Sequence, residues 1–487
     1  MVARRYMSEA YALVQQVKSD EWRGMWCHYG NGPMKIGGGN KPWRSTLREL
    51  ASQGYNAIIP NVLWSGIAYY PSEIVPQSAY VDAEGDLMAQ IISAAKENNM
   101  EVHAWKVMFQ FAEGWLAPTN APDKFKEEGR MQVNSDGDTT TWLSPFMPEN
   151  VEYEIAAIEE LVKKYDVQGL HLDYIRFYGP NVDFSSHARK ALEKKIGRAV
   201  KNWPKDAIDG PLVEKFNEVR REQITKIMRE IYQRVKAIKP DVVVSAAVFG
   251  KPDFARDMVF QDWGEWAKEG IVDAVFPMSY TADVEGFKGQ IRQHKLALEG
   301  TKTKLYVGIG SVVTAWQTLD LDILADEITV TREANVDGFA FFEAQEYFMK
   351  KDLPFLSAGM TRKDSGKIAL PETENLVAMG KPAVGQAGRK LPNQEKLLIA
   401  DFETGWDKEF GGLYYFMDIA GKPTLQLESS MKLWWPHTEA IYAFALAYKM
   451  TADNFWLEKL NVVHDYSFKH FVDQKYGEWF GYCDRQG

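Results

Sequence analysis

Short apolar runs alternate with longer amphipathic stretches over about the first 350 residues. The runs are rich in β-branched and aromatic residues, as buried strands are. They occupy residues 22–27, 56–62, 100–107, 167–173, 241–249, 272–279, 304–309 and 336–342. The stretches between them repeat with the period of a helix, as Phe216, Val219, Ile224 and Ile227 do within residues 213–239. Eight strand–helix units in this order predict an α/β fold, the (β/α)8 TIM barrel.

An open, doubly wound sheet is the alternative arrangement of the same elements. No G-x-G-x-x-G motif follows any predicted strand, so the nucleotide-binding version of that sheet lacks its main support. The "GGGN" at residues 37–40 has no following Lys-Ser/Thr and indicates a flexible loop instead of a phosphate-binding one.

Two connections are unusually long, residues 108–150 after the third predicted strand and residues 178–212 after the fourth. Both leave the carboxyl ends of strands. In a barrel these ends form the rim where active sites are built, so we expect both connections to be functional.

The pattern divides the chain into four parts. Residues 1–19 resemble a short amphipathic helix, and residues 20–355 contain the barrel pattern. Residues 356–395 are rich in Gly, Pro, Lys and Asn without sustained periodicity, which is typical of a linker. Residues 396–487 are again aromatic and helical.

Composition excludes several classes of protein. The net charge is −10 and the basic residues are dispersed, so nucleic acid is not an expected partner. No apolar run is long enough to span a membrane. The only cysteines, Cys27 and Cys483, lie near opposite ends, and no spacing suggests a metal site or a cofactor. The N-terminus lacks the apolar core of a signal peptide, so we expect a cytoplasmic protein, or a periplasmic or extracellular one if the N-terminus is incomplete.

The fourth predicted strand carries charge at its exit, in "VQGLHLDYIRFYGP" at residues 167–180. Alternate side chains share a face, so His171 and Asp173 should face the barrel interior while the leucines between them face the helices. A buried carboxylate is costly unless it is paired, and Arg176 is the natural partner. The pair is either structural, closing the barrel, or functional, holding Asp173 ionised as a nucleophile or as a stabiliser of an oxocarbenium-like state.

Glycoside hydrolysis normally needs a second carboxylate. In "FAFFEAQEY" after the eighth strand, Phe339, Phe341 and Glu343 alternate onto one face, which makes Glu343 the first candidate for acid/base. The fifth strand is followed by no acid before Asp253, the second candidate. Either residue is alternatively an ordinary acid at the rim.

Other polar and aromatic side chains are predicted to line the same end. A lone histidine in such a wall is more often a hydrogen-bonded structural residue than a catalyst, and a tryptophan serves either the core or sugar stacking. Together the residues would form a polar, aromatic cup that suits a sugar. The predicted substrate-binding residues are His28, Asn61, Trp64, His103, Trp105, His171, Arg176 and Tyr280.

Several segments of the first 355 residues resemble, in order, the family 10-like glycosyl hydrolases. They are "EWRGMWCH", "YYPSE", "MEVHAWKV", "YDVQGLHLDYIRF", "WGEWAKEGIVDAVFPMSY" and "VGIGS". The resemblance implies a barrel related to the α-amylase superfamily, and a hydrolase of bacterial glycans, peptidoglycan among them. By similarity to the α-amylase pattern, Asp173 would be the nucleophile. The sequence departs from that pattern at the fifth strand, where no Glu occupies the usual acid/base position.

The last part resembles another family, the N-acylglucosamine 2-epimerases, over residues 396–487. The segments "GWDKEFGGLYYFMD", "KLWWPHTEAIYAFALAY" and "YGEWFGY" carry the resemblance. It implies a small, incomplete piece of an (α/α)6 barrel, in which Glu439 matches the active-site glutamate and His437 lies beside it. The family's proton-transferring histidines have no match here, so we expect no epimerisation by this segment alone.

Three functions therefore remain open from the sequence. The first is a glycoside hydrolase with its site around Asp173. The second is a non-catalytic barrel that binds carbohydrate through its aromatic residues. The third is a sugar 2-epimerase or isomerase. All three imply a carbohydrate partner, while the glycan, its linkage and the oligomeric state are not specified.

Overall fold

The computed structural model describes residues 8–9, 11–13, 15–18, 20–28, 43–111, 121–314, 317–345, 347–362, 402–415, 430–451, 453–473 and 480–487. The chain forms two compact units. One is Gln16–Ser365, and the other combines Met1–Gln15 with Gly366–Gly487. The "GGGN" loop and most of the predicted linker lie outside the described residues.

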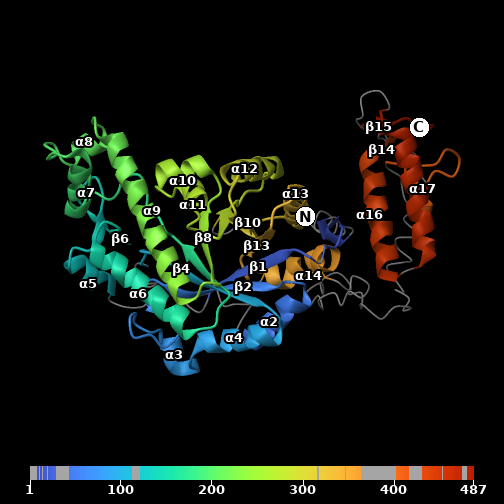
Figure 1. The fold of residues 1–487 in the computed structure, drawn as a ribbon. Helices are drawn as coiled ribbons and strands as arrows, with labels where there is room; N and C mark the ends of the chain where they lie inside the picture. Colours follow the sequence, from blue (N-terminus) through green and yellow to red (C-terminus); the bar gives the residue numbers. More distant parts are fainter. Residues whose placement is uncertain are drawn as a thin grey trace. The chain divides into compact units, whose positions relative to one another are not determined.

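The first unit is a closed barrel of parallel strands, which confirms the predicted fold (Figure 1). The sheet closes because β1 pairs in parallel with both β2 and β13. In barrel order the strands are β1 (Trp22–Cys27), β2 (Ala57–Trp64), β4 (Glu101–Val107), β7 (Gly169–Asp173), β8 (Val243–Phe249), β9 (Ala274–Met278), β10 (Lys304–Gly310) and β13 (Gly338–Phe342). Each strand coincides with one of the apolar runs.

Amphipathic helices surround the strands (Figure 1). Their apolar stripes face inward; on α6, for example, Val151, Ile155, Ile158 and Val162 are all buried. The helices are α2 (Trp43–Ser52), α4 (Leu87–Glu97), α6 (Pro148–Lys164), α9 (Val213–Ile238), α11 (Trp263–Glu269), α12 (Val284–Ala297) and α13 (Leu321–Glu333).

The two long connections contain structure of their own. The connection after β4 includes α5 (Ala121–Glu127) and an antiparallel hairpin of β5 (Met131–Val133) and β6 (Thr139–Leu143). The connection after β7 includes α7 (Ser186–Ile196) and α8 (Lys205–Ile208). The remaining short elements are β3 (Ile67–Ala68), α3 (Ala79–Glu84), α10 (Pro252–Met258), β11 (Val312–Thr314) and β12 (Gln317–Thr318).

The barrel ends in a helical segment that contacts the turn directly after α2. It consists of the π-helical η2 (Phe348–Asp352), α14 (Leu353–Leu356) and the π-helical η3 (Ser357–Thr361). Thr361 Oγ1 donates to the Gln53 carbonyl at 2.6 Å. Gly54 follows with a φ of +89°, and a Cβ there would come within 2.2 Å of the Thr361 carbonyl oxygen, so only glycine fits.

Large aromatic rings fill the barrel interior, where branched aliphatic residues are more usual. Trp26, Trp105, Phe276 and Tyr306 belong to one buried cluster. Glycines on neighbouring strands make room for these large side chains. A Cβ on Gly169, for example, would lie 2.1 Å from Nδ1 of His103. The interior is therefore a packed core, and a ligand has access only at the rim.

The outward face of β4 carries an ion pair that the apolar pattern did not predict. Lys106 Nζ lies 2.5 Å from Glu154 Oε2 on α6, and both side chains are buried. Glu154 also accepts a hydrogen bond from the Phe109 N–H at 3.1 Å, which fixes the start of the long connection after β4.

The second unit is built around two helices, α16 (Trp434–Thr451) and α17 (Asn454–His470), which pack side by side (Figure 1). Phe402, Phe444, Trp456 and Val463 form its core. A short antiparallel pair of β14 (Lys432–Leu433) and β15 (Tyr482–Cys483) joins the segments that flank the helices. Exposed apolar side chains on this unit include Trp434 and Trp435, as expected for a piece of a larger helical barrel.

A buried acid on α13 should make the stability of the barrel depend on pH. Neither carboxylate oxygen of Glu327 has a hydrogen-bond partner, and burial raises the pKa of this group to about 9. The pKa of Glu327 is higher in the folded state than in the unfolded state. The free energy of unfolding is therefore greatest at low pH and falls as pH rises towards 9, by at most about 1.4 kcal/mol per pH unit. Glu327→Gln should remove this loss.

Urea unfolding of the wild type and of Glu327→Gln at several values between pH 5 and pH 9 measures the effect. The difference in the free energy of unfolding should grow with pH in favour of the variant. A constant difference across the range would contradict the assignment of a buried, protonated Glu327.

Candidate active site

Asp173 lies at the carboxyl end of β7, and its side chain is buried in the mouth of the barrel. Its carboxylate accepts a hydrogen bond from the Tyr174 N–H at 2.8 Å, and its carbonyl accepts one from the Met108 N–H, also at 2.8 Å. Tyr174 has a φ of 56°, in the left-handed region that non-glycine residues seldom occupy. The strand therefore ends in a strained residue directly after the carboxylate, which is a common feature of functional sites.

The environment of Asp173 shifts its titration towards neutral pH. Burial raises the pKa to about 6, although the Arg176 charge, the Tyr174 N–H, His28 and Trp105 all act to lower it. Burial therefore has the largest effect on the pKa of Asp173, and the neighbouring groups offset this rise only in part. The carboxylate is ionised at neutral pH but close to its titration point.

Arg176 does not form the direct ion pair with Asp173 that the sequence predicts, although the structure describes both residues. Its guanidinium donates to the Phe177 carbonyl at 3.1 Å. It lies over the rings of Tyr174, Trp142 and Phe249, at 4.4, 5.0 and 5.0 Å from their centroids. Aromatic faces thus hold the cation, which acts on Asp173 through its field instead of a contact.

Glu343 reaches the same mouth from the end of β13, but by a different geometry than predicted. Ala340 and Phe342 face the barrel interior, whereas Phe341 contacts Tyr55 and Phe348 on the outside. The strand ends at Phe342, so alternation does not continue to Glu343. Its backbone N–H donates to Ser311 Oγ at 3.2 Å, and the side chain is buried.

His28 is the close partner of Glu343. Its Nδ1 is in hydrogen-bonding contact with Glu343 Oε2, while Gln345 Nε2 lies 3.4 Å from Oε1. The imidazole also lowers the pKa of Asp173, so it lies within electrostatic range of both acids. Its ring packs 4.6 Å from that of Trp105.

Tyr280 completes the group. Its ring stacks on Phe342 at 5.3 Å with an interplanar angle of 21°. Burial raises the pKa of its hydroxyl well above its usual value, and the charges of Asp173 and Glu343 raise it further. The structure therefore gathers both carboxylates, His28 and Tyr280 around one mouth, from four different strand ends.

Aromatic and amide groups form the wall beside His28. Trp64 Nε1 donates to Gln110 Oε1 at 2.8 Å. Asn61 pairs in register with Trp105, and both are buried. The Asn61 side-chain amide has no protein hydrogen-bond partner, which is costly for a buried polar group and is typical of surfaces that meet a polar ligand. Trp105, in contrast, lowers the pKa of Asp173 through a side-chain hydrogen bond.

Three of the predicted residues lie elsewhere. His171 is one layer below the mouth, where its Nδ1 hydrogen-bonds Ser245 Oγ at 3.0 Å and its Nε2 accepts from Trp26 Nε1 at 3.1 Å. Burial lowers its pKa well below the usual value, so it is a neutral core histidine. His103 lies deeper still, beside Glu101 at the opposite end of β4 from Asp173, and Asp253 is exposed on α10.

The rings around Arg176 were not identified as part of the site from the sequence. Tyr174 follows strand β7, Phe249 ends strand β8, and Trp142 comes from the hairpin in the long connection after β4. The aromatic cluster in "DYIRFY" was the available signal, but only the fold brings Trp142 to it.

In the second unit, His437 has a structural role. Its Nε2 accepts from the Leu413 N–H at 2.8 Å and its Nδ1 hydrogen-bonds the Leu433 carbonyl at 2.6 Å. Burial lowers its pKa to about 4. Glu439 is exposed on α16. The two residues matched to the epimerase pattern therefore form no proton-transfer pair.

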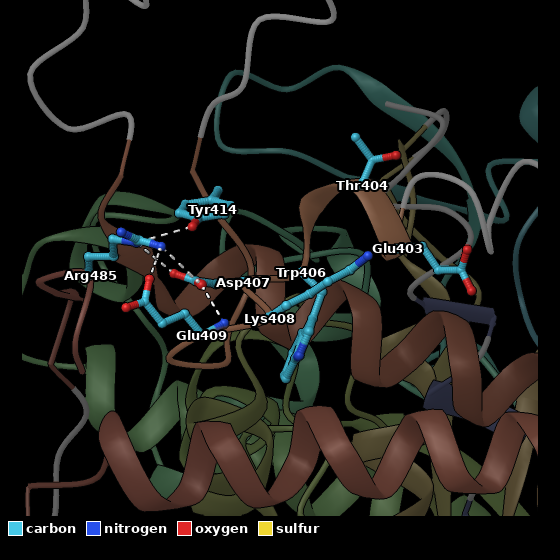
Figure 2. A pocket seen from close by; sticks show the side chains of 8 residues that line it. All are labelled: Glu403, Thr404, Trp406, Asp407, Lys408, Glu409, Tyr414 and Arg485. Atoms are coloured by element: carbon cyan, nitrogen blue, oxygen red, sulfur yellow. Dashed lines mark hydrogen bonds and ion pairs between the residues drawn. The ribbon is translucent and has the colours of Figure 1, made fainter. Parts of the chain in front are cut away.

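A polar cavity of about 700 Å³ lies in the same unit (Figure 2). At its centre Arg485 contacts Asp407, Glu409 and Tyr414, and Lys432 lies 3.0 Å from Asp407 on the buried side. These charges are already paired within the unit, so the network joins its segments. The lining residues are Glu403, Thr404, Trp406, Asp407, Lys408, Glu409, Tyr414 and Arg485.

Within the described part of the chain, no group of three or more His, Cys, Asp or Glu side chains is arranged to hold a metal ion. No helix among those residues is long and apolar enough to span a membrane.

Comparison with known proteins agrees with the barrel fold. The family described as "Glycosyl hydrolase-like 10" matches residues 24–316, which is more than half of the 487 residues. The chain belongs to the glycosyl hydrolase-like 10 family. A second family, N-acylglucosamine 2-epimerase, matches residues 377–487, which include the helical unit.

Individual relatives of this glycosyl hydrolase-like 10 protein show the same division. Glycosyl hydrolase YngK of Bacillus subtilis is 25% identical over 259 residues, 48% of each chain. N-acylglucosamine 2-epimerase of Bos taurus is 50% identical over 93 residues, 19% of this chain and 22% of that protein. The chain thus spans about half of the first relative's length and a fifth of the second's.

The structure of the glycoside hydrolase domain of PgaB (BpsB) from Bordetella bronchiseptica has the same fold. It aligns with a TM-score of 0.54 and 17% identity, over 70% of this chain and 99% of that one.

The ion network of the helical unit should stabilise that unit. Burial acts to raise the pKa of Asp407, but hydrogen bonds from Arg485, Tyr414 and Lys432 outweigh it and hold the pKa below its usual value. Asp407→Asn leaves the buried Lys432 without its carboxylate, and should cost about 3 kcal/mol. Amide hydrogen exchange of α16 and α17 should accelerate by about 100-fold.

Glu403→Gln is the matched control, because Glu403 is an exposed acid on the same cavity. It should leave exchange in both helices unchanged. Equal effects of the two substitutions would mean that the network contributes nothing specific.

Proposed function

We propose that this protein is a glycoside hydrolase that acts on a bacterial or environmental glycan, with stem-peptide-free peptidoglycan strands as one candidate. The observation that carries the proposal is the pair of buried carboxylates, Asp173 and Glu343, that share one mouth with His28 and Tyr280. Two carboxyl groups flanking a sugar bond are what glycoside hydrolysis requires. Membership of a glycosyl hydrolase-like family supports the same chemistry.

Asp173 is assigned as the nucleophile or as the carboxylate that stabilises the oxocarbenium-like state. Either role needs the ionised form. The Tyr174 N–H and the nearby Arg176 cation favour that form, and burial in an aromatic mouth strengthens its attraction for a developing positive charge.

Glu343 is assigned as the acid/base, taking the place of the glutamate that the fifth strand lacks. A general acid must hold a proton that it can release to the leaving oxygen. The contact between Glu343 Oε2 and His28 Nδ1 provides a hydrogen-bond partner that fixes the orientation of the carboxyl group. His28 is therefore a positioning residue for Glu343.

A carbohydrate-binding barrel without catalysis is the second candidate. It is favoured by one observation: both carboxylate oxygens of Glu343 have protein neighbours, His28 and Gln345. The epimerase reading has less support, because His437 is buried with its ring nitrogens engaged by the backbone and Glu439 is exposed.

Release of reducing ends from a glycan panel tests the proposal. Asp173→Asn should lower kcat/KM by at least about 10³-fold while glycan binding is retained, because it removes the charge and keeps the shape. Glu343→Gln should also lower kcat/KM strongly. Asp253→Asn is the control, since this acid is exposed on α10. Binding without hydrolysis by the wild type would instead support the non-catalytic barrel.

The pH dependence of kcat/KM should report the ionisation of Asp173. Activity needs the carboxylate, so it should fall as pH drops below about 6, the pKa of this group. Arg176→Gln removes a charge that lowers this pKa, and should move the acid limb to higher pH by about one unit. Arg176→Lys keeps the positive charge and should move the acid limb less. An acid limb that is the same in all three proteins would remove Asp173 from this role.

A further inference from the structure

The hairpin of β5 and β6 joins the two long connections at the rim of the barrel. On one side β6 lies antiparallel to the chain that follows β4, where the Leu143 N–H donates to the Phe109 carbonyl at 2.9 Å. On the other side β5 lies beside the connection that follows β7, where the Phe184 N–H donates to the Val133 carbonyl at 2.8 Å. The hairpin is therefore held from both sides by backbone hydrogen bonds.

Asp183 fastens this hairpin to the connection after β7. Its side chain is fully buried, and its carboxylate accepts hydrogen bonds from the Val133 N–H at 3.0 Å and from the Ser144 hydroxyl. The Ser185 N–H and hydroxyl donate to the same carboxylate at 2.9 and 3.2 Å. Hydrogen bonds to an ionised acceptor are stronger than those between neutral groups. One carboxylate thus ties the hairpin and the chain directly after it to the other connection.

The connection that contains Asp183 is itself anchored to α9. The buried guanidinium of Arg220 donates to the Pro180 carbonyl at 2.7 Å and contacts the Val182 carbonyl. Burial lowers the pKa of Arg220 to about 9, and the charge of Asp183 opposes this fall, so the two charges lie within electrostatic range. Asp183 therefore ties the hairpin to a segment that the barrel holds in place.

The hairpin reaches the surroundings of Asp173 by two routes. The buried ring of Trp142 on β6 lies 5.2 Å from the Tyr174 ring, and the Arg176 guanidinium lies 5.0 Å from the Trp142 ring. The chain that pairs with β6 also contacts the backbone of Asp173, because the Met108 N–H donates to the Asp173 carbonyl at 2.8 Å. The position of the hairpin therefore decides how well these groups are shielded from water.

We propose that Asp183 is a positioning residue for the reaction at Asp173: its carboxylate holds the hairpin closed, and the closed hairpin keeps water from Asp173 and Arg176. The proposal rests on the proposed function and extends it to a residue that does not meet the substrate. Asp183 is fully buried and both its oxygens accept protein hydrogen bonds, so it is not a catalytic acid. Exclusion of water matters because charges stabilise an oxocarbenium-like state more strongly in a low dielectric.

Loosening the hairpin should lower the pKa of Asp173. This pKa lies above the usual aspartate value because burial outweighs the groups that lower it. Water that enters the mouth weakens both effects, so the pKa should return towards the usual value. The direction is opposite to that expected for Arg176→Gln, which removes a charge.

Charged and titratable groups from four strand ends share the mouth with Asp173. They are Arg176 and Tyr174 after β7, His28 after β1, Tyr280 after β9 and Glu343 after β13. None of these five residues belongs to the hairpin. A lower pKa of Asp173 in a hairpin variant would therefore report the entry of water and not the loss of one of these groups.

Single substitutions in the full-length protein test the proposal. Ser144→Ala removes one hydrogen bond to Asp183, Asp183→Ala removes all four, and Asp183→Asn keeps the shape and one acceptor oxygen. Thr225→Val is the matched control for Ser144→Ala, because each deletes one buried hydroxyl group. The Thr225 hydroxyl accepts a hydrogen bond from Trp266 Nε1 at 3.1 Å between α9 and α11, outside the hairpin.

Three measurements are made on each protein. Amide hydrogen exchange reports how often β5 and β6 open. Carbon NMR of aspartates labelled at the carboxyl group measures the pKa of Asp173 without turnover, and the loss of its signal in Asp173→Asn identifies it. Steady-state kinetics on a glycan that the wild type hydrolyses gives kcat and KM.

Ser144→Ala should accelerate exchange in the hairpin by about tenfold, lower the pKa of Asp173 by about half a unit and lower kcat by about 3- to 10-fold, with KM nearly unchanged. Asp183→Ala should cause larger changes in the same directions, and Asp183→Asn should restore most of the wild-type behaviour. Thr225→Val should leave the hairpin, the pKa of Asp173 and kcat unchanged.

Faster exchange in the hairpin with an unchanged pKa of Asp173 would overturn the proposal, because Asp183 would then be purely structural. Unchanged exchange, a pKa that rises, or equal shifts in Thr225→Val would also overturn it. If Asp183→Ala does not fold, Ser144→Ala decides alone. A lowered pKa of Asp173 in a protein that hydrolyses no glycan would keep the role of Asp183 at Asp173 and reject the hydrolase. Hydrolysis with an unchanged pKa in the variants would do the reverse.

Discussion

The arrangement of side chains at the mouth of this barrel depends on the free-energy cost of burying a negative charge among aromatic rings. Asp173 is buried, and burial alone would favour its neutral form. The Tyr174 N–H, the Arg176 cation and His28 each reduce that cost, but together they do not cancel it. The strained turn at Tyr174 and the rings stacked around Arg176 are consequences of the same requirement, because they hold the compensating groups in place.

The sequence predicted the fold and the part of the site that lies on β7. Apolar runs located all the barrel strands, and alternation along β7 placed His171 and Asp173 on the inner face. Alternation along a strand predicts which face a side chain occupies, but not how deep in the barrel it lies. His171 and His103 were therefore predicted at the mouth, whereas the structure places them in the core below it. It also fails beyond the end of a strand, which is why Glu343 reaches the mouth by a path that the pattern did not predict.

The helical unit shows the difference between similarity and function. Its sequence is half identical to an epimerase over 93 residues, and it keeps a core of two packed helices. However, His437 and Glu439, the two residues that match the epimerase pattern, are not arranged for proton transfer in the described part of the unit. The His437 ring nitrogens are both engaged by backbone groups, and the charges around the cavity are paired with each other. No pattern in one sequence distinguishes such a structural histidine from a catalytic one.

The solid interior of the barrel restricts the routes by which a long ligand can come and go. Rings of Trp26, Phe276 and Tyr306 form a buried cluster in the interior below the mouth, and Gly308 leaves room for the Trp26 ring. A polymer therefore cannot thread through the barrel; it has to lie across the rim. Under the proposed function, both fragments of a cleaved chain would leave sideways into solvent, and neither would have to pass Asp173 and Glu343 again on its way out.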